Sequence, residues 1–174
     1  MTAHMNRSLT IIALTVLCPA AALAESPFDT LTKAATDAGK GEAEKRVNDK
    51  LLQEARKNQC SFKSGTAELA AGCDAKLKKL TSALVDAKRQ LDSSGAHAYK
   101  FEVSGHTDSS GDAAKNKVLS EQRAQTIVNE LVARGIGKGE IIAVGRGSEA
   151  MLVKPDDTSA KKQKNRRYEI RVRL

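Results

Sequence analysis

The residues most able to do chemistry lie together in the stretch GHTDSSG, which runs from Gly105 to Gly111 and holds an imidazole, a carboxylate and three hydroxyls. A Ser–His–Asp catalytic site needs its three members to converge in space on one reacting atom. Here His106 and Asp108 are near neighbours in one extended segment, where successive side chains point to opposite sides. A metal site is not favoured either, because His97 stands alone and the cysteines are expected to pair. We therefore predict no catalytic residue, no metal and no other cofactor.

An arginine downstream gives Asp108 a different use. Ser120 is a candidate helix N-cap, which places Arg123 in the first helical turn, facing the positive end of the helix dipole. The free backbone N–H groups of such a turn attract an anion. Asp108 can accept a hydrogen bond from an ammonium while Arg123 and the helix N-terminus take a carboxylate, and this matches a zwitterionic amino-acid head group. A plain salt bridge between Asp108 and Arg123 explains their spacing equally well.

Alternating strands and helices position these residues. Tyr99, Phe101 and Val103 alternate with polar residues in a strand that leads into GHTDSSG. The same kind of periodicity gives the remaining elements, which are strands at 60–62, 140–147 and 167–174 and helices over 75–91 and 120–132. The predicted fold class is α/β (α+β), a two-layer sandwich in which a mixed sheet of about four strands is packed by two main helices.

Two segments precede this domain, which covers residues 58–174. Residues 1–24 have a positive start, a short apolar run and a small-residue end, which predicts a signal peptide. Lipid attachment at Cys18 is the less favoured alternative, because Leu17 is not the small residue that such signals prefer. Residues 25–57 are predicted to form a helical N-terminal extension, in which Gly39 ends a first helix and a second follows. The second helix either rests one apolar stripe on the domain, which we favour, or serves as a coiled-coil dimerisation arm.

Charge and cysteine content narrow the class of protein. The formal net charge of +8 favours anionic partners such as cell wall, lipid head groups or nucleic acid. An aromatic content of 3% without any Trp argues against the stacking platforms that bind single-stranded nucleic acid, and no nucleic-acid partner is expected.

Removal of the leader leaves two cysteines, Cys60 and Cys73. An even count in an exported chain predicts one disulfide between them, worth about 3 kcal/mol by the chain-entropy estimate.

The motif residues form a longer ordered pattern. GHTDSSGDAAKNKVLSEQRA is followed by GRG and then by NRRYEI, and in this order and spacing they resemble the OmpA-like carboxy-terminal domain family over residues 58–174. Members of that family bind peptidoglycan without catalysis by gripping the diaminopimelate residue of its stem peptide. The resemblance implies peptidoglycan as the partner and the periplasm as the location, in association with the outer membrane or cell wall.

The resemblance also implies roles for individual residues. The family's acid matches Asp108, which would take the ammonium of diaminopimelate, and its arginine matches Arg123, which would take the carboxylate together with the helix N-terminus. Further ligand-binding residues are expected at Asn116, Ser110, Leu119 and Ser120. Gly65 and Arg166 are expected as secondary ligand contacts, whereas His106 is expected to orient the loop.

Two stretches depart from the family pattern. GRGSEAMLV stands where the family often has GxGExxP, so the loop up to Pro155 has no expected shape. Near Phe62 the chain reads FKSGTAEL, where the family tends to have an acidic or Asn-bearing turn.

The alternative function is that of an exported basic protein that binds an anionic polymer or an envelope partner by charge, without a specific pocket. Residues 25–57 are the expected contact for an envelope protein.

Overall fold

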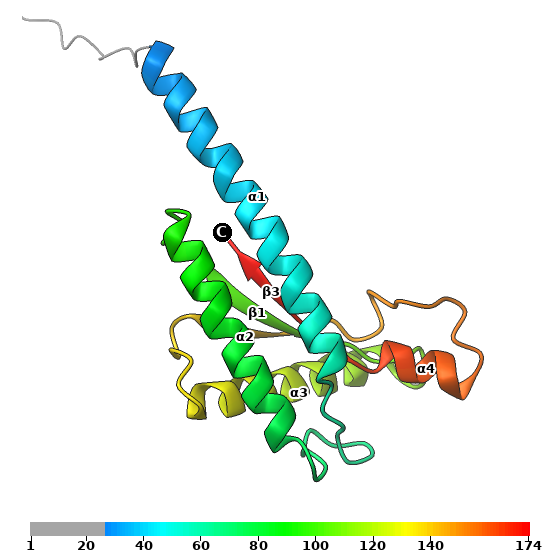
Figure 1. Cartoon of the computed structure of the whole chain (residues 1–174). Coiled ribbons are helices and arrows are strands. Elements are labelled where there is room, and N and C mark those ends of the chain that lie inside the picture. The colour runs from blue at the N-terminus through cyan, green and yellow to red at the C-terminus, as the bar shows by residue number, and fades with distance from the viewer. Residues whose placement is uncertain (1–26) are drawn as a thin grey trace, which may run out of the picture.

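The computed structural model describes residues 27–174, with side chains from residue 39 onwards, so the predicted signal peptide lies outside the described residues. The elements in chain order are α1 (Pro27–Lys57), α2 (Asp74–Ser93), β1 (Lys100–Gly105), α3 (Ala113–Ala133), β2 (Ile141–Gly145), α4 (Ser159–Asn165) and β3 (Tyr168–Arg173). The strand order is β2-β1-β3, with β1 parallel to β2 and antiparallel to β3 (Figure 1). The predicted α/β class and mixed sheet are confirmed, but the described sheet has three strands rather than four.

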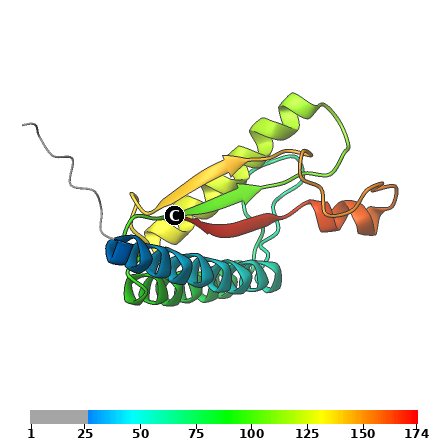
Figure 2. The same cartoon turned by 90° about the horizontal axis from the view of Figure 1, so that it is seen from above.

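Strand alternation divides the sheet into an apolar face and a charged face. Phe101 and Val103 of β1 lie in register with Val172 and Ile170 of β3, and all four side chains are buried. Helices α1, α2 and α3 pack over this face, and their buried residues join the same core, among them Val47, Leu51, Ala55, Leu77, Leu80, Leu84, Ala124, Ile127 and Leu131. In Figure 2 the blue-to-cyan α1 and the green α2 lie side by side along the sheet. Helices and sheet are thus the two predicted layers.

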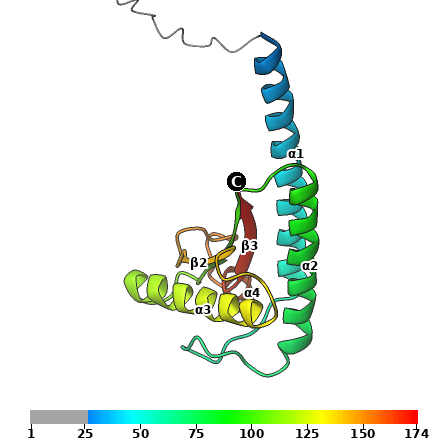
Figure 3. The same ribbon diagram turned by 90° about the vertical axis from the view of Figure 1, so that its left-hand side faces the viewer.

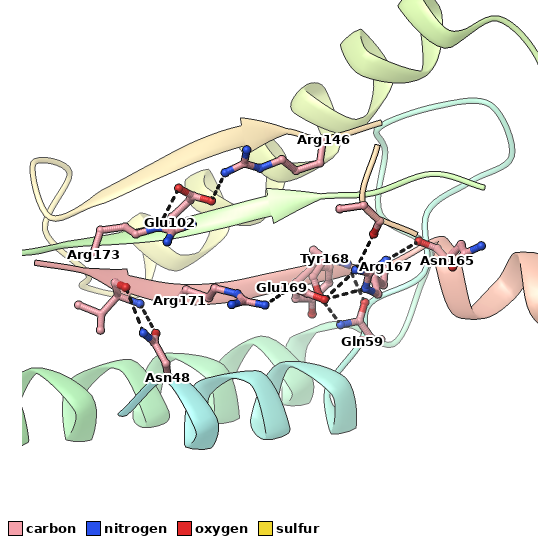
Figure 4. Close-up of polar contacts among 12 residues, drawn as sticks. Asn48, Gln59, Glu102, Arg146, Asn165, Arg167, Tyr168, Glu169, Arg171 and Arg173 are labelled. Atoms are coloured by element: carbon pink, nitrogen blue, oxygen red, sulfur yellow. Dashed lines mark hydrogen bonds and ion pairs between the residues drawn. The ribbon is translucent and has the colours of Figure 1, made fainter. Parts of the chain in front are cut away.

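The opposite face of the sheet carries two buried carboxylates, each held by two arginines (Figure 4). The ion pairs are Glu102–Arg146 at 2.9 Å, Glu102–Arg173 at 3.3 Å, Glu169–Arg167 at 2.8 Å and Glu169–Arg171 at 3.1 Å. Burial raises the pKa of both carboxyl groups, but the hydrogen bonds from the arginines outweigh it and leave both pKa values below the ordinary range. Both carboxylates are therefore ionised and paired at neutral pH.

α1 is one continuous helix rather than the two that Gly39 predicts. A glycine inside a helix lowers the stability of the helix by only about 1 kcal/mol relative to alanine. Packing of other residues of α1 can offset this cost, so the helix continues past Gly39. The second half of α1 belongs to the core, because Val47, Leu51 and Ala55 are buried where α1 packs on β3 and α2. The first half extends past the rest of the domain (Figure 3). Within residues 27–174, no helix combines the length and apolarity needed to cross a bilayer.

Two side-chain amides close the outer edge of β3. The Asn48 side chain accepts a hydrogen bond from the Val172 N–H at 2.7 Å and donates one to the Val172 carbonyl at 3.3 Å. Gln59 makes the same pair of bonds at Tyr168, accepting at 3.1 Å and donating at 2.8 Å. Each amide thus satisfies a backbone N–H and C=O that a neighbouring strand would otherwise pair.

The predicted strand at 60–62 was wrong for this reason. α1, with Asn48 on it and Gln59 just after its end, occupies the place of a fourth strand beside β3. Near 60–62 only an isolated bridge between Phe62 and Leu69 forms. The segment is instead fixed by the buried Tyr168 hydroxyl, which donates to the Asn58 carbonyl at 2.6 Å and accepts from the Cys60 N–H at 3.2 Å. The segment at 60–62 therefore packs beside the sheet and is not one of its strands.

Removing one of the edge amides should weaken the fold. In Asn48→Ala the Val172 N–H and C=O lose both partners, and each buried polar group left unpaired costs about 1–3 kcal/mol. We expect the free energy of unfolding to fall by about 2 kcal/mol, measured by urea denaturation. Asn129→Ala on the exposed side of α3 is the matched control, with an expected change below about 0.5 kcal/mol. Equal midpoints for the two variants would show that Asn48 does not stabilise β3.

Candidate ligand-binding site

A cavity of about 1180 Å³ opens at one end of the sheet. It is bounded by the loop after β1, the first half of α3, the segment between α1 and α2, and the junction of α4 with β3. The predicted site residues that line it are Gly65, Asp108, Ser110, Asn116, Leu119, Arg123 and Arg166. Folding thus brings most of the predicted site to one place. Ser120 is the exception, since it is not among the residues that line the cavity.

The helix that carries Arg123 begins earlier than predicted. Asp112 is its N-cap, with a carboxylate that accepts from the Lys115 N–H at 2.8 Å. Ser120 lies inside α3 and is fully buried, and its hydroxyl accepts from the Gly147 N–H at 2.9 Å. The prediction of Ser120 as the N-cap was wrong because Asp112 offers an earlier cap, and the residues after it propagate a helix well. Arg123 therefore lies in the middle of α3, away from the free backbone N–H groups of the first turn.

Asp108 is a buried, ionised carboxylate with an arginine partner. Its Oδ2 lies 2.6 Å from Nη1 of Arg166, and its Oδ1 accepts from the Ser110 N–H at 2.9 Å. Burial raises the pKa of Asp108, but the hydrogen bonds from Arg166 and Ser110 outweigh it, so the pKa lies below the ordinary value. A carboxylate offers about four acceptor sites, so these bonds leave room for a further donor.

Arg123 is held by groups other than Asp108. Its Nε donates to the Thr66 carbonyl at 2.9 Å, and its guanidinium lies over the Phe62 ring at 5.1 Å from the ring centre. Burial and the charge of Arg166 lower the pKa of Arg123, while the charge of Asp108 raises it. The alternative of a plain salt bridge between Asp108 and Arg123 is therefore not realised, because Arg166 takes that place. The Nη groups of Arg123 keep hydrogen-bonding capacity for a ligand.

Two polar side chains hold the loop that carries Asp108. The Asn116 amide donates to the Ser110 carbonyl at 2.7 Å, and the Ser110 hydroxyl accepts from Lys162 Nζ at 2.8 Å. Gly111 has a φ of +83°, in the left-handed region that disfavours side chains. Asn116 of α3 and Lys162 of α4 thus hold the loop at Ser110, and Asn116 and Ser110 also line the cavity.

A buried network that the sequence did not reveal holds the same loop. Asp156, in the connection before α4, accepts from the Ser109 N–H at 2.9 Å, from the Ser109 hydroxyl, and from the Asn165 amide at 3.1 Å. The hydrogen bonds from Ser109, more than that from Asn165, lower the pKa of Asp156 to about 2. Asn165 was visible in the sequence as the first residue of NRR, but Asp156 lies in the connection that departs from the family pattern.

His106 lies in a buried, cationic environment next to the cavity. Neither ring nitrogen has a hydrogen-bond partner among the described residues. Burial, followed by the charge of Arg167, lowers the pKa of His106 to about 4, while the charge of Glu169 opposes this. The imidazole is therefore neutral at physiological pH. This environment fits the loop-orienting role expected of His106 and gives it no free charge for a ligand.

The two cysteines are buried neighbours but are not bonded. Cys60 and Cys73 are free thiols in the structure, with Cys60 Sγ 3.8 Å from the Cys73 carbonyl oxygen. Burial and the neighbouring Cys73 raise the pKa of Cys60 to about 12. Its thiolate, the form that takes part in disulfide exchange, is therefore scarce at neutral pH. The predicted disulfide is not formed here and stays a prediction for the oxidised protein.

The charges around the cavity are strongly unequal. Asp108 is the one carboxylate among the lining residues, against the cations Arg56, Arg123, Lys164, Arg166 and Arg167. Within the part of the chain that the structure describes, no three His, Cys, Asp or Glu side chains group closely enough to hold a metal ion. The arrangement can therefore bind a ligand that carries one ammonium and several anionic groups.

The sequence is similar to a known protein family and to curated relatives. A family model described as OmpA family matches residues 61–167. Outer membrane porin F of Pseudomonas fluorescens is 43% identical over 75 residues, which cover 43% of this chain and 23% of porin F. Peptidoglycan-binding protein ArfA of Mycobacterium tuberculosis is 40% identical over 70 residues, which cover 40% of this chain and 21% of ArfA. The matched part thus spans less than a quarter of these curated relatives.

The fold is shared with solved structures. The peptidoglycan-associated lipoprotein from Burkholderia pseudomallei aligns with a TM-score of 0.54 and 20% sequence identity, over 66% of this chain and 89% of that chain. At this identity the likeness concerns the fold alone. It agrees with the family match, which covers more than half of the residues and includes both the GHTDSSG loop and α3. The chain therefore belongs to the OmpA family.

Proposed function

We propose that this chain is a non-catalytic module that binds peptidoglycan through the diaminopimelate residue of the stem peptide. The observation that carries the proposal is the placement of Asp108 and Arg123 in one cavity, each held by its own protein partner. Asp108 takes the ammonium of the amino-acid head group, and the guanidinium of Arg123 takes its carboxylate. Membership of the OmpA family supports the proposal, as does the name of its relative, peptidoglycan-binding protein ArfA.

The neighbours of this pair prepare it for the ligand. Arg166 and Ser110 keep Asp108 ionised, and the remaining acceptor capacity of the carboxylate receives the ammonium. Asn116, Leu119 and the backbone of Gly65 complete the surface that the head group meets. Arg123 acts through its side chain alone, because α3 begins ten residues before it at Ala113 and leaves no free N–H groups beside it. Ser120 contributes by fixing α3 against Gly147 rather than by touching the ligand.

The proposal also includes a location and a partner. The predicted leader at residues 1–24 directs the chain to the periplasm, where the binding site meets the wall near the outer membrane. Porin F, an outer membrane protein by its name, is similar to this chain and supports that placement. Residues 25–57 contact an envelope protein, since the first half of α1 extends past the domain (Figure 3).

Co-sedimentation with purified sacculi tests the binding site. We expect Asp108→Ala and Arg123→Ala each to weaken binding by about tenfold or more, because a hydrogen bond to a charged group is worth about 1.5–3 kcal/mol. The matched controls are Asp86→Ala and Arg89→Ala, which break an exposed 3.2 Å ion pair on α2 with the same changes in net charge. Both controls should pellet like the unaltered protein. Normal pelleting of Asp108→Ala and Arg123→Ala would show that these two residues do not bind peptidoglycan.

A second function, binding of an anionic polymer by charge alone, is favoured by the net charge of +8. It makes the opposite prediction for the acidic variants, since both Asp108→Ala and Asp86→Ala would then bind sacculi more tightly. Charge-driven binding also weakens steeply with salt and is not displaced by free diaminopimelate. Displacement by millimolar diaminopimelate at constant ionic strength would support the pocket and exclude binding by charge alone.

A further inference from the structure

The cavity is larger than the proposed head group needs. Its volume of about 1180 Å³ is slightly above the range of about 300–1,000 Å³ that is usual for pockets binding whole drug-sized ligands. An amino-acid head group bound between Asp108 and Arg123 therefore leaves part of the cavity for the residues attached to it. The lining of that remaining part indicates what those residues carry.

Two of the lining cations have no partner of their own. Arg166 is bonded to Asp108 and Gln163, and Arg167 is buried against Glu169. In contrast, the side chains of Arg56 and Lys164 make no hydrogen bond or ion pair with any residue that the structure describes. Both line the cavity and both are exposed. They are unneutralised charges in a cavity with a single carboxylate, which is itself already paired.

The fold places these two cations in the lining of one cavity from distant parts of the chain. Arg56 lies in the last turn of α1, and Lys164 lies in the last turn of α4. Figure 1 shows the end of α1 next to the junction of α4 with β3, where the hydrogen bonds of Gln59 to Tyr168 hold the two segments in place. A cation in the last turn is favoured by its own helix dipole, which explains how each is tolerated without an acid. It does not reduce their attraction for an external anion.

We propose that Arg56 and Lys164 form a second subsite that binds a carboxylate of the residue next to diaminopimelate in the stem peptide. The inference rests on the proposed function, because the head group must first be held by Asp108 and Arg123. In the stem peptide a γ-linked glutamate precedes the diamino acid and leaves its α-carboxylate free. This places an anion one residue away from the head group, within the same ligand. With this subsite the cavity recognises the neighbouring residue as well as the diamino acid.

Calorimetric titration of soluble ligands tests this subsite. The ligands are free diaminopimelate, the tripeptide Ala-γ-Glu-diaminopimelate with a free glutamate α-carboxylate, and the same tripeptide with that carboxylate amidated. We expect the unaltered protein to bind the acid tripeptide about fivefold more tightly than the amide, since two exposed ion pairs are worth about 1 kcal/mol together. In the double variant Arg56→Gln/Lys164→Gln this ratio should fall to about one.

Control variants separate the subsite from the overall charge. Arg46→Gln and Lys79→Gln remove the same two types of cation from surfaces outside the cavity and should keep the fivefold ratio. Equal binding of the acid and amide tripeptides by the unaltered protein would overturn the subsite, as would a ratio that persists in the double variant. Failure of the unaltered protein to bind free diaminopimelate would instead overturn the proposed function, so the two failures are distinguishable.

A phosphate is the other anion that such a subsite could take. The titration therefore includes glycerol phosphate as a competitor for the acid tripeptide. Competition that requires Arg56 and Lys164, together with equal affinities for the two tripeptides, would replace the carboxylate by a phosphate-bearing wall component and overturn the proposal. No competition at millimolar glycerol phosphate, with the fivefold ratio intact, supports it.

Discussion

Replacing Gly105 with alanine is expected to lower the free energy of unfolding by about 3 kcal/mol, the upper end of the usual cost of overpacking. A Cβ at this position would lie 2.1 Å from the Ser120 carbonyl oxygen and 2.9 Å from its carbonyl carbon. These are backbone atoms of α3, so no side-chain rotation relieves the clash. The helix must move away from β1, and this strains the hydrogen bond between Ser120 and the Gly147 N–H.

The same substitution should weaken ligand binding, because Asp108 follows β1 and Arg123 belongs to α3. We expect a lower urea midpoint and at least a tenfold loss of affinity for diaminopimelate. Gly39→Ala is the matched control. A Cβ there meets nothing within 4 Å, and alanine favours the interior of α1, so stability should rise by about 0.5–1 kcal/mol. A Gly105→Ala protein as stable as the unaltered one would show that the close approach of β1 and α3 is not required.

Asn165→Ala is expected to cost about 3 kcal/mol through a buried hydrogen-bond network. The fully buried Asn165 side chain accepts from the Leu152 N–H at 2.8 Å and the Val153 N–H at 3.1 Å. It also donates to the Val153 carbonyl at 3.0 Å and to Asp156 at 3.1 Å. Alanine leaves each of these groups unpaired, and a buried unpaired group costs about 1–3 kcal/mol before any relaxation.

The consequence of Asn165→Ala should reach the binding site through Asp156 and Ser109. Thermal unfolding gives the stability, and titration with diaminopimelate gives the binding. We expect both to fall, whereas Asn129→Ala on the exposed side of α3 should change neither. Because the pKa of Asp156 is lowered to about 2 in the folded protein, its stabilising contribution is present above its ordinary pKa and is lost as pH falls towards 2. If Asn165→Ala matches Asn129→Ala in both measurements, the network does not support the loop.

Most of the helices and strands could be predicted because their apolar residues repeat with the period of a helix or of a strand. Phe101 and Val103 alternate along β1, and the apolar stripe of α2 repeats with the helical period, so both were correctly placed. The strand at 60–62 failed because so short a segment has no period to test. Its place beside β3 is decided by Asn48 and Gln59, whose partners lie 124 and 109 residues further along the chain. Periodicity does not detect side-chain amides that replace a strand.

The site was predictable where a motif names its residues and not where distant residues complete it. Asp108 and Arg123 line one cavity as the motif indicates. The partner of Asp108 is Arg166, 58 residues away, and no pattern in the sequence favours Arg166 over Arg123 as that partner. The start of α3 was misplaced because Asp112 caps the helix eight residues before Ser120, and the residues between them continue the helix. Asp156 had no motif to mark it.

The shape of α1 sets a stand-off distance. The helix has 31 residues, and at 1.5 Å per residue its ends lie about 45 Å apart. Its last turn borders the cavity through Arg56, while its first turn is at the far end, beyond the domain (Figures 1 and 3). A body fastened to the first turn would be kept a nearly constant interval from whatever the cavity grips. A flexible tether of equal length would allow that interval to fluctuate and to collapse.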